Sequence, residues 1–190
     1  MSPSSEPVYD WRICLKCAME ANQGADHNRY FPLASSGEDG TPRVRWVVFR
    51  GFVGDSDDVC IVTDARSEKV TEFQRQPRCE FSWYFTETRE QFRVRAHVIT
   101  VDSRCPDQTQ RLSAWQALSQ AARESFYGPH PGFPLVTGTD VPLTTEQIPA
   151  AFVVLILRPD HVDHLLLPLP QRRWLSTLES GNWCSTPVNP

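Results

Sequence analysis

The feature that most constrains the fold of this chain is a pair of alternating segments near its middle. Residues 79–85 alternate apolar side chains with polar or amphipathic ones, and residues 92–98 do the same. Successive side chains of a β-strand point to opposite faces, so each segment predicts a strand with one apolar face. Five polar residues, 86–90, separate the segments and predict the loop of a hairpin. An antiparallel sheet is therefore expected.

The polar face of the second segment forms a stripe of Gln91, Arg93, Arg95 and His97. Such a stripe is usually a solvated outer surface. In a dimer it could equally line a buried polar interface between subunits. Both interpretations stay open, and the sequence alone favours the solvated one.

A basic run from Arg43 to Lys69 stands out in a chain that is acidic overall. Residues 43–52 predict a strand, residues 54–58 a turn, and residues 61–69 a second strand that passes into a helix, so the two strands are expected to form a hairpin. Cations at strand ends beside a helix N-terminus suit a phosphate group. Solvated strand charges are the alternative, and from charge alone the more common case. The cations are Arg43, Arg45, Arg50, Arg66 and Lys69.

Periodicity predicts the remaining elements of the first half. Apolar residues at helical spacing predict an amphipathic helix over about 8–22, and a short strand follows at 30–34. A turn at 37–40 is expected to join this strand to the strand over 43–52 as a hairpin. Ser67 is expected to cap a helix that continues to about Arg75, where Pro77 stops it.

The second half is expected to contain one helix and several strands. Residues 106–126 predict the helix, and a long Pro/Gly-rich loop over 127–149 is typical of a segment that covers a site. The strands are expected at 151–157, at 162–167, about 173–175 and near Trp183, with a turn at 179–182. Seven or eight mostly antiparallel strands with three helices indicate a closed barrel decorated by helices.

Composition indicates one globular domain. A chain of 190 residues, 40% of them hydrophobic, can bury a single core, so residues 1–190 are expected to form one domain. With 19 basic and 23 acidic residues the net charge is −4, which excludes a general attraction to nucleic acid or anionic membranes. Neither a membrane-spanning run nor a signal pattern is found, so a cytoplasmic location is expected.

The cysteines and histidines predict no metal or disulfide framework. Six scattered cysteines in a chain of this length are expected to be reduced thiols. Cys14 and Cys17 alone have motif spacing, and as neighbours on one helix face they are interpreted as small core residues rather than as zinc or redox ligands. His161 and His164 would point to opposite faces of a strand.

Four motifs together resemble the FMN-binding core of the pyridoxamine 5'-phosphate oxidase superfamily. They are residues 45–50 (RWVVFR), residues 63–69 (TDARSEK), Trp83 with residues 89–94 (REQFRV), and a C-terminal end made of 162–165, 172–174 and 183–190. Their order and spacing match the family over about residues 30–190.

The resemblance implies a fold that is mainly β with flanking helices: a split β-barrel of antiparallel Greek-key type. It further implies a homodimer that holds FMN in clefts at the subunit interface. Arg45 and Lys69 would bind the FMN phosphate, with Ser67 in the same loop, while Gln91 would hydrogen-bond the flavin ring and Arg173 would approach the ring from the C-terminal segment. The residues assigned to the cofactor are Arg45, Trp46, Val47, Val48, Phe49, Arg50, Thr63, Arg66, Ser67, Lys69, Gln91 and Arg173.

Three departures from the family pattern bear on function. Glu68 stands where the family usually has a second basic residue, and Arg66 is the candidate substitute; Leu165 replaces a tryptophan; and residues 167–173 lack the arginine and histidine that handle the pyridoxal substrate. The expected function is an FMN-dependent oxidoreductase that acts on an unidentified small molecule and oxidises pyridoxamine phosphate poorly. The alternative is a non-catalytic flavin- or haem-binding module. A barrel that serves only in protein interaction would leave Arg45, Lys69 and Gln91 unexplained.

Overall fold

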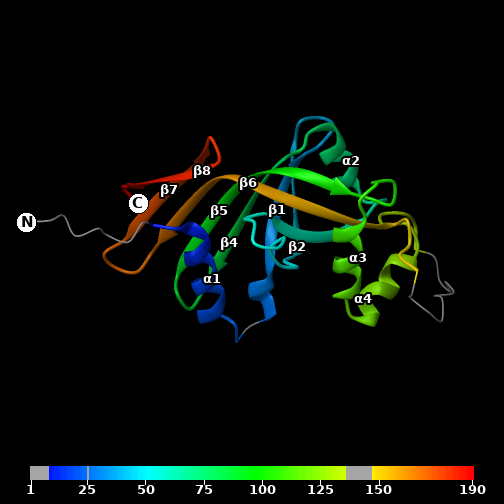
Figure 1. Cartoon of the computed structure of the whole chain (residues 1–190), viewed down its shortest axis with the longest axis horizontal. Coiled ribbons are helices and arrows are strands. Elements are labelled where there is room, and N and C mark those ends of the chain that lie inside the picture. Colours follow the sequence, from blue (N-terminus) through cyan, green and yellow to red (C-terminus); the bar gives the residue numbers. More distant parts are fainter. Residues whose placement is uncertain (1–8, 25, 136–146) are drawn as a thin grey trace, which may run out of the picture.

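The fold is organised by one long strand, β6 (Phe152–Leu166), which runs through the middle of the molecule (Figure 1). The structure is a computed structural model that describes residues 9–24, 26–135 and 147–190. One edge of β6 pairs with β5 (Glu90–Val101). Its other edge pairs first with β3 (Val59–Asp64) and then with β7 (Arg172–Glu179). The first six residues of β6 are buried, which explains their unbroken apolar sequence.

The described strands form one antiparallel sheet that closes into a barrel. Its order is β2-β1-β4-β5-β6-β7-β8, and β3 joins it through β6. Closure comes where the chain leaves β2: the Arg50 N–H donates to the Cys60 carbonyl at 2.9 Å, and the Cys60 N–H donates to the Gly51 carbonyl at 2.8 Å. Strands β7 and β8 extend beyond the barrel. The remaining bounds are β1 (Tyr30–Ser36), β2 (Pro42–Val48), β4 (Arg78–Phe85) and β8 (Asn182–Val188).

Helices cover both ends of the barrel. Helix α1 (Trp11–Ala21) begins at Asp10, whose carboxylate accepts from two backbone N–H groups, and it packs Trp11 and Leu15 into the core. Helix α2 (Glu68–Arg75) follows β3. Helices α3 (Thr109–Gln116) and α4 (Gln120–Glu124) lie at the opposite end of β6 from β7 and β8 (Figure 1). Two short 3₁₀ helices, η1 (Asp26–Arg29) and η2 (Ser125–Tyr127), complete the described elements.

Several predicted elements are confirmed. Strands β4 and β5 pair antiparallel as the expected hairpin, with Phe81 opposite Val94. The helices predicted at 8–22 and from Ser67 to Arg75 are α1 and α2. The Ser67 side chain does not cap α2 as expected, because its hydroxyl donates to the Asp64 carbonyl at 2.7 Å. The turn at 179–182 joins β7 to β8, with Ser180 and Gly181 at positive φ.

The predicted hairpin of residues 30–34 with residues 43–52 is confirmed as β1 and β2, but the predicted pairing of residues 43–52 with the strand after them is wrong. Strand β2 ends at Val48 and pairs with β1, whereas β3 pairs with β6. The bridge between Phe52 and Val59 and the closure hydrogen bonds join the two segments. A local hairpin was expected because the segments are neighbours in sequence, but the strand that pairs with β3, β6, lies much later in the chain.

Two further boundaries differ from expectation. The helix predicted over 106–126 is divided into α3, α4 and η2, because Ser119 starts a new helix by accepting a hydrogen bond from the Ala122 N–H. The strands predicted at 151–157 and 162–167 are one strand, β6. Pro159 sits at a bulge there, opposite Ala96, while His161 already faces Arg95, so the ladder tolerates the missing N–H.

Part of the predicted 127–149 loop, residues 136–146, lies outside the described residues. All six cysteines are free thiols, and Cys17 is exposed rather than part of the core. Among the described residues, no helix is long and apolar enough to cross a membrane, and no cluster of His, Cys, Asp or Glu could hold a metal.

Candidate cofactor site

Lys69 lies at the centre of a polar cluster where β3 turns into α2. Its Nζ donates to Thr63 Oγ1 at 3.0 Å and to Ser67 Oγ at 3.1 Å. The turn is tight, because the Ser67 N–H donates to the Asp64 carbonyl at 3.0 Å. Lys69 is in the first turn of α2, where backbone N–H groups have no partner within the helix. The Lys69 side chain and the N-terminus of α2 therefore belong to the same polar cluster.

Arg45 enters this cluster from β2. Its Nη2 donates to Glu72 Oε2 at 2.8 Å, and its Nη1 donates to Ser35 Oγ. Ser35 Oγ in turn donates to Glu72 Oε2 at 2.5 Å. We call Arg45, Lys69, Thr63, Ser67, Ser35 and Glu72 the basic cluster.

The electrostatics of the basic cluster favour an anion. Burial lowers the pKa of Lys69, the positive charge of Arg45 lowers it further, and nearby carboxylates, Glu72 first, partly oppose the shift. A bound phosphate would stabilise both cations, because each gains an opposite charge. An arginine fork and a lysine point charge are the usual protein ligands of a phosphate.

Arg66 is committed elsewhere and does not join the basic cluster. Its guanidinium donates to both carboxylate oxygens of Asp64, at 2.9 and 2.6 Å, and to the Gly128 carbonyl at 3.2 and 3.1 Å. The hydrogen bonds to Asp64 raise the pKa of Arg66, and the bonds to Gly128 tie the turn after β3 to the start of the 127–149 loop.

Gln91 and Arg173 lie on one row across the sheet. Gln91 is opposite Leu165, and Leu165 is opposite Arg173, so the three side chains share one face. The side chain of Gln91 makes no hydrogen bond to any described residue. Arg173 instead donates to both carboxylate oxygens of Asp163, at 2.9 and 2.8 Å, and Arg93 donates to the same carboxylate. The predicted ring contacts are thus placed together, but Arg173 is held by an acid.

Residues 46–49, which were predicted to run along the flavin ring, form the end of the edge strand β2 and the residue after it. In the described chain β2 pairs only with β1, so half of its backbone polar groups face outward and are available to a ligand. The Trp46 side chain is 70% exposed on the face that also carries Gln91, while Val47 is buried and Val48 and Phe49 are half-buried.

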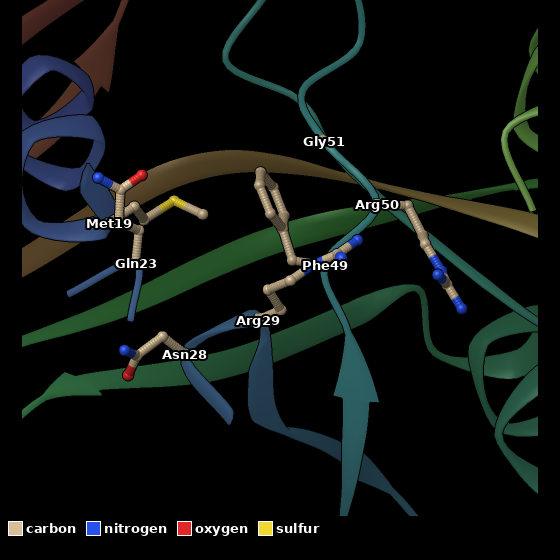
Figure 2. Close-up of a pocket in the computed structure, with 7 residues that line it drawn as sticks. All are labelled: Met19, Gln23, Asn28, Arg29, Phe49, Arg50 and Gly51. Carbon is tan, nitrogen blue, oxygen red and sulfur yellow. The ribbon is translucent and has the colours of Figure 1, made fainter. Parts of the chain in front are cut away.

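Arg50 and Phe49 border a cavity of about 340 Å³ between β2 and α1 (Figure 2). Figure 2 shows the Arg50 side chain directed away from Met19 and Gln23. Its Nε is buried without a hydrogen-bond partner among the described residues. Burial lowers the pKa of Arg50, and so does the neighbouring Arg29. The Nε–H group of Arg50 therefore lacks a hydrogen-bond acceptor among the described residues.

A wider groove of about 1200 Å³ lies between α1 and strands β7 and β8, on the opposite face of the sheet from Gln91. At its floor Tyr9 Oη hydrogen-bonds His164 Nδ1 at 2.7 Å, and His164 Nε2 hydrogen-bonds Glu90 Oε2 at 2.8 Å. Tyr9 also stacks on Trp174.

The sequence interpretation missed three residues that hold the predicted ones: Ser35, Glu72 and Asp163. Glu72 carried a usable signal, since it follows Lys69 by three positions and so lies on the same helix face. Asp163 and Ser35 carried none, because their contacts depend on strand register.

The arrangement fits a flavin mononucleotide. The basic cluster offers two cations and two hydroxyl groups to a phosphate, the orphaned Arg50 Nε needs an acceptor, and Gln91 presents an amide that can both donate and accept. The fold and the site together define a split-barrel flavoprotein.

Comparison with known proteins gives the family. Residues 8–102 match the family model described as "Pyridoxamine 5'-phosphate oxidase, FMN-binding domain". The chain is 39% identical over 194 residues to a protein of Arabidopsis thaliana named "Pyridoxine/pyridoxamine 5'-phosphate oxidase 2", covering 96% of this chain and 98% of that protein. The chain therefore belongs to the FMN-binding pyridoxamine 5'-phosphate oxidase family, and its cofactor is FMN.

Solved structures show the same fold. A pyridoxamine 5'-phosphate oxidase-related, FMN-binding protein of Nostoc punctiforme superposes with a TM-score of 0.91 at 36% identity, covering 97% of this chain and all of that one. PhzG of Burkholderia lata superposes with a TM-score of 0.75, covering 100% of this chain and 95% of that one; at 18% identity it shows the fold alone. The predicted antiparallel split barrel is thus confirmed.

Proposed function

We propose that this protein is an FMN-dependent oxidoreductase that acts on a small molecule. The observation that carries the proposal is the basic cluster, in which Arg45 and Lys69 lie together at a helix N-terminus with the hydroxyl groups of Thr63 and Ser67. The first test is whether the purified protein is yellow and releases FMN on denaturation. Colourless protein that takes up no added FMN would reject the proposal.

Most of the predicted residues are proposed to act in binding. Arg45 and Lys69 hold the phosphate, and the outward backbone groups of residues 46–49 run along the ring. Gln91 hydrogen-bonds the ring, and Arg173 approaches it once Asp163 shares or releases the guanidinium. Bound FMN supplies hydride-transfer chemistry, while the protein supplies orientation and electrostatics. Arg66 orders the loop at Gly128 rather than contacting the phosphate.

We further propose a homodimer with FMN between subunits. Strands β2 and β5 are three steps apart in the sheet, about 14 Å at roughly 4.8 Å per step. Gln91 of one copy is thus far from β2 of the same copy, and a second copy can bring the two together around one ring. The exposed apolar side chains Val44, Trp46 and Tyr84 share the face of Gln91 and offer a contact surface.

Free thiols throughout support a reducing, cytoplasmic location.

The substrate is the open part of the proposal. The name of the Arabidopsis relative makes pyridoxine and pyridoxamine phosphates the first compounds to assay. We nevertheless expect slow or absent oxidation, because residues 167–173 provide Arg172 and Arg173 without a neighbouring histidine to position the substrate. A steady-state assay with pyridoxamine phosphate, oxygen and FMN-loaded protein decides this. Turnover of about 1 per second or more would show that other residues replace the missing pair.

A further inference from the structure

Glu72 is a carboxylate in an unusual place. It lies in the second turn of α2 between the buried Val70 and Phe73, and only 8% of it is exposed. Burial of a charged group is unfavourable unless hydrogen bonds and an opposite charge compensate it. Both are present, since Arg45 Nη2 lies 2.8 Å and Ser35 Oγ 2.5 Å from the same carboxylate oxygen.

The basic cluster needs this carboxylate when no phosphate is bound. Arg45 and Lys69 repel one another, as the lowering effect of Arg45 on the pKa of Lys69 shows, and Glu72 opposes that effect. Without Glu72, a mobile arginine would turn towards solvent to separate the two charges. Arginine has five N–H donors, and the contacts to Ser35, Glu72 and the Arg43 carbonyl use three of them. The other two remain for a ligand.

We propose that Glu72 is a positioning residue that, with Ser35, fixes Arg45 beside Lys69 before the phosphate of the flavin nucleotide arrives. The inference rests on the proposed phosphate role of the basic cluster. Preorganisation of this kind improves affinity, because the side-chain entropy of the arginine is lost on folding rather than on binding. It predicts that removing a negative charge near the phosphate weakens binding, the reverse of what simple repulsion predicts.

The test compares two variants with the same change in charge on one helix. Glu72→Gln removes the buried carboxylate, and Glu68→Gln removes the exposed one four residues earlier. Dissociation constants for FMN and for riboflavin, which lacks the phosphate, are measured by quenching of flavin fluorescence. We expect Glu72→Gln to weaken FMN about tenfold and to leave riboflavin unchanged. Glu68→Gln is expected to leave FMN unchanged or to tighten it. Equal or tighter FMN binding by Glu72→Gln overturns the inference.

Ser35→Ala keeps the inference testable if Glu72→Gln folds poorly. It removes the hydroxyl that bridges Arg45 and Glu72 but leaves every charge in place. A several-fold loss of FMN affinity with unchanged riboflavin affinity is expected, and no loss contradicts the inference. Arg45→Ala distinguishes a failure of the phosphate assignment from a failure of the positioning role alone. If Arg45→Ala binds FMN like the parent, the phosphate assignment itself fails; if Arg45→Ala is weak while Glu72→Gln and Ser35→Ala are not, only the positioning role fails.

Discussion

Arg173 and Asp163 form a two-point ion pair across β7 and β6, with Nε 2.9 Å from Oδ1 and Nη2 2.8 Å from Oδ2. Arg93 on β5 donates to the same carboxylate, so one acid joins three neighbouring strands. Only 5% of Asp163 is exposed. Burial alone would raise the pKa of Asp163, but the hydrogen bonds from Arg173 and Arg93 outweigh it and hold the pKa below its ordinary value.

The first prediction concerns acid stability. A carboxyl group with a lowered pKa stabilises the fold above its unfolded pKa, about 3.9, and this contribution is lost as pH falls through the lower folded value. Asp163→Asn should therefore reduce the free energy of unfolding at pH 7 by about 1–3 kcal/mol and reduce its decline below about pH 4. Urea unfolding at both pH values measures this. Asp160→Asn, a half-exposed acid on β6 that pairs with Arg78, is the control and should change stability by less than about 1 kcal/mol. Equal effects of the two variants would refute the prediction.

The second prediction tests the phosphate contacts. Arg45→Ala and Lys69→Ala should each weaken FMN binding by about 1.5–3 kcal/mol, tenfold or more, because each removes one charge-assisted contact. Fluorescence titration with FMN gives the dissociation constants. Arg43→Ala is the matched control, since Arg43 is exposed on the same strand and pairs only with Asp39 among the described residues. Parent-like binding by both variants would show that the assignment is wrong.

The third prediction addresses the position before Lys69. Glu68→Arg should tighten FMN binding, because Arg66 already bonds to Asp64 and Gly128 and we propose that the family's second cation has no substitute in this chain. The gain should shrink with added salt, since Glu68 is exposed and exposed charges are screened. Titrations at low and high ionic strength measure both effects. Unchanged affinity at low salt would instead favour Arg66 as the substitute.

The fourth prediction concerns the groove behind α1. Tyr9→Phe should lower the free energy of unfolding by about 0.5–1.5 kcal/mol, because it removes the hydrogen bond between Tyr9 Oη and His164 Nδ1. Burial raises the pKa of Tyr9, so this phenol should stay protonated at a pH where exposed tyrosines ionise, which an ultraviolet titration detects. Tyr30→Phe, at an exposed tyrosine outside that groove, is the control and should be within about 0.5 kcal/mol of the parent. Equal losses would mean that the bond contributes nothing.

The fifth prediction concerns assembly. The mass in solution should be that of a homodimer, and Val44→Arg should shift it towards the monomer and lower FMN affinity, because Val44 is 66% exposed on the proposed contact face. Light scattering after size-exclusion chromatography measures the mass. Leu112→Arg, on an exposed site of α3, should remain dimeric. A strictly monomeric parent that binds FMN stoichiometrically would exclude the dimer.

The local parts of the fold were predictable from sequence, and the distant pairings were not. The alternation in residues 79–98 fixed β4 and β5 because a half-buried strand repeats every two residues. Residues 151–157 and 162–167 were expected to be separate strands, yet Pro159 occupies a bulge within one strand, β6. Ser119 looked like a helix residue, yet it caps α4. A single side chain decided each of these cases.

The candidate site also contains some residues that were predictable from sequence and some that were not. Lys69, Ser67 and Thr63 were recognisable together because they share one strand-to-helix turn. The partners of Arg45 and Arg173 were not, since Glu72 and Asp163 reach them through tertiary contact and strand register. Motif reasoning locates the groups that touch a ligand more readily than the groups that hold them.

Strand β6 also sets the order in which the chain can mature during synthesis. Strand β3 is complete at residue 64, but its ladder partner spans residues 152–157 and leaves the ribosome much later. Until then the apolar β3 has an open edge, which is where other chains attach and aggregates begin. The barrel can therefore close only after β6 has been synthesised. The rate of translation between β3 and β6 determines how long the edge of β3 stays exposed.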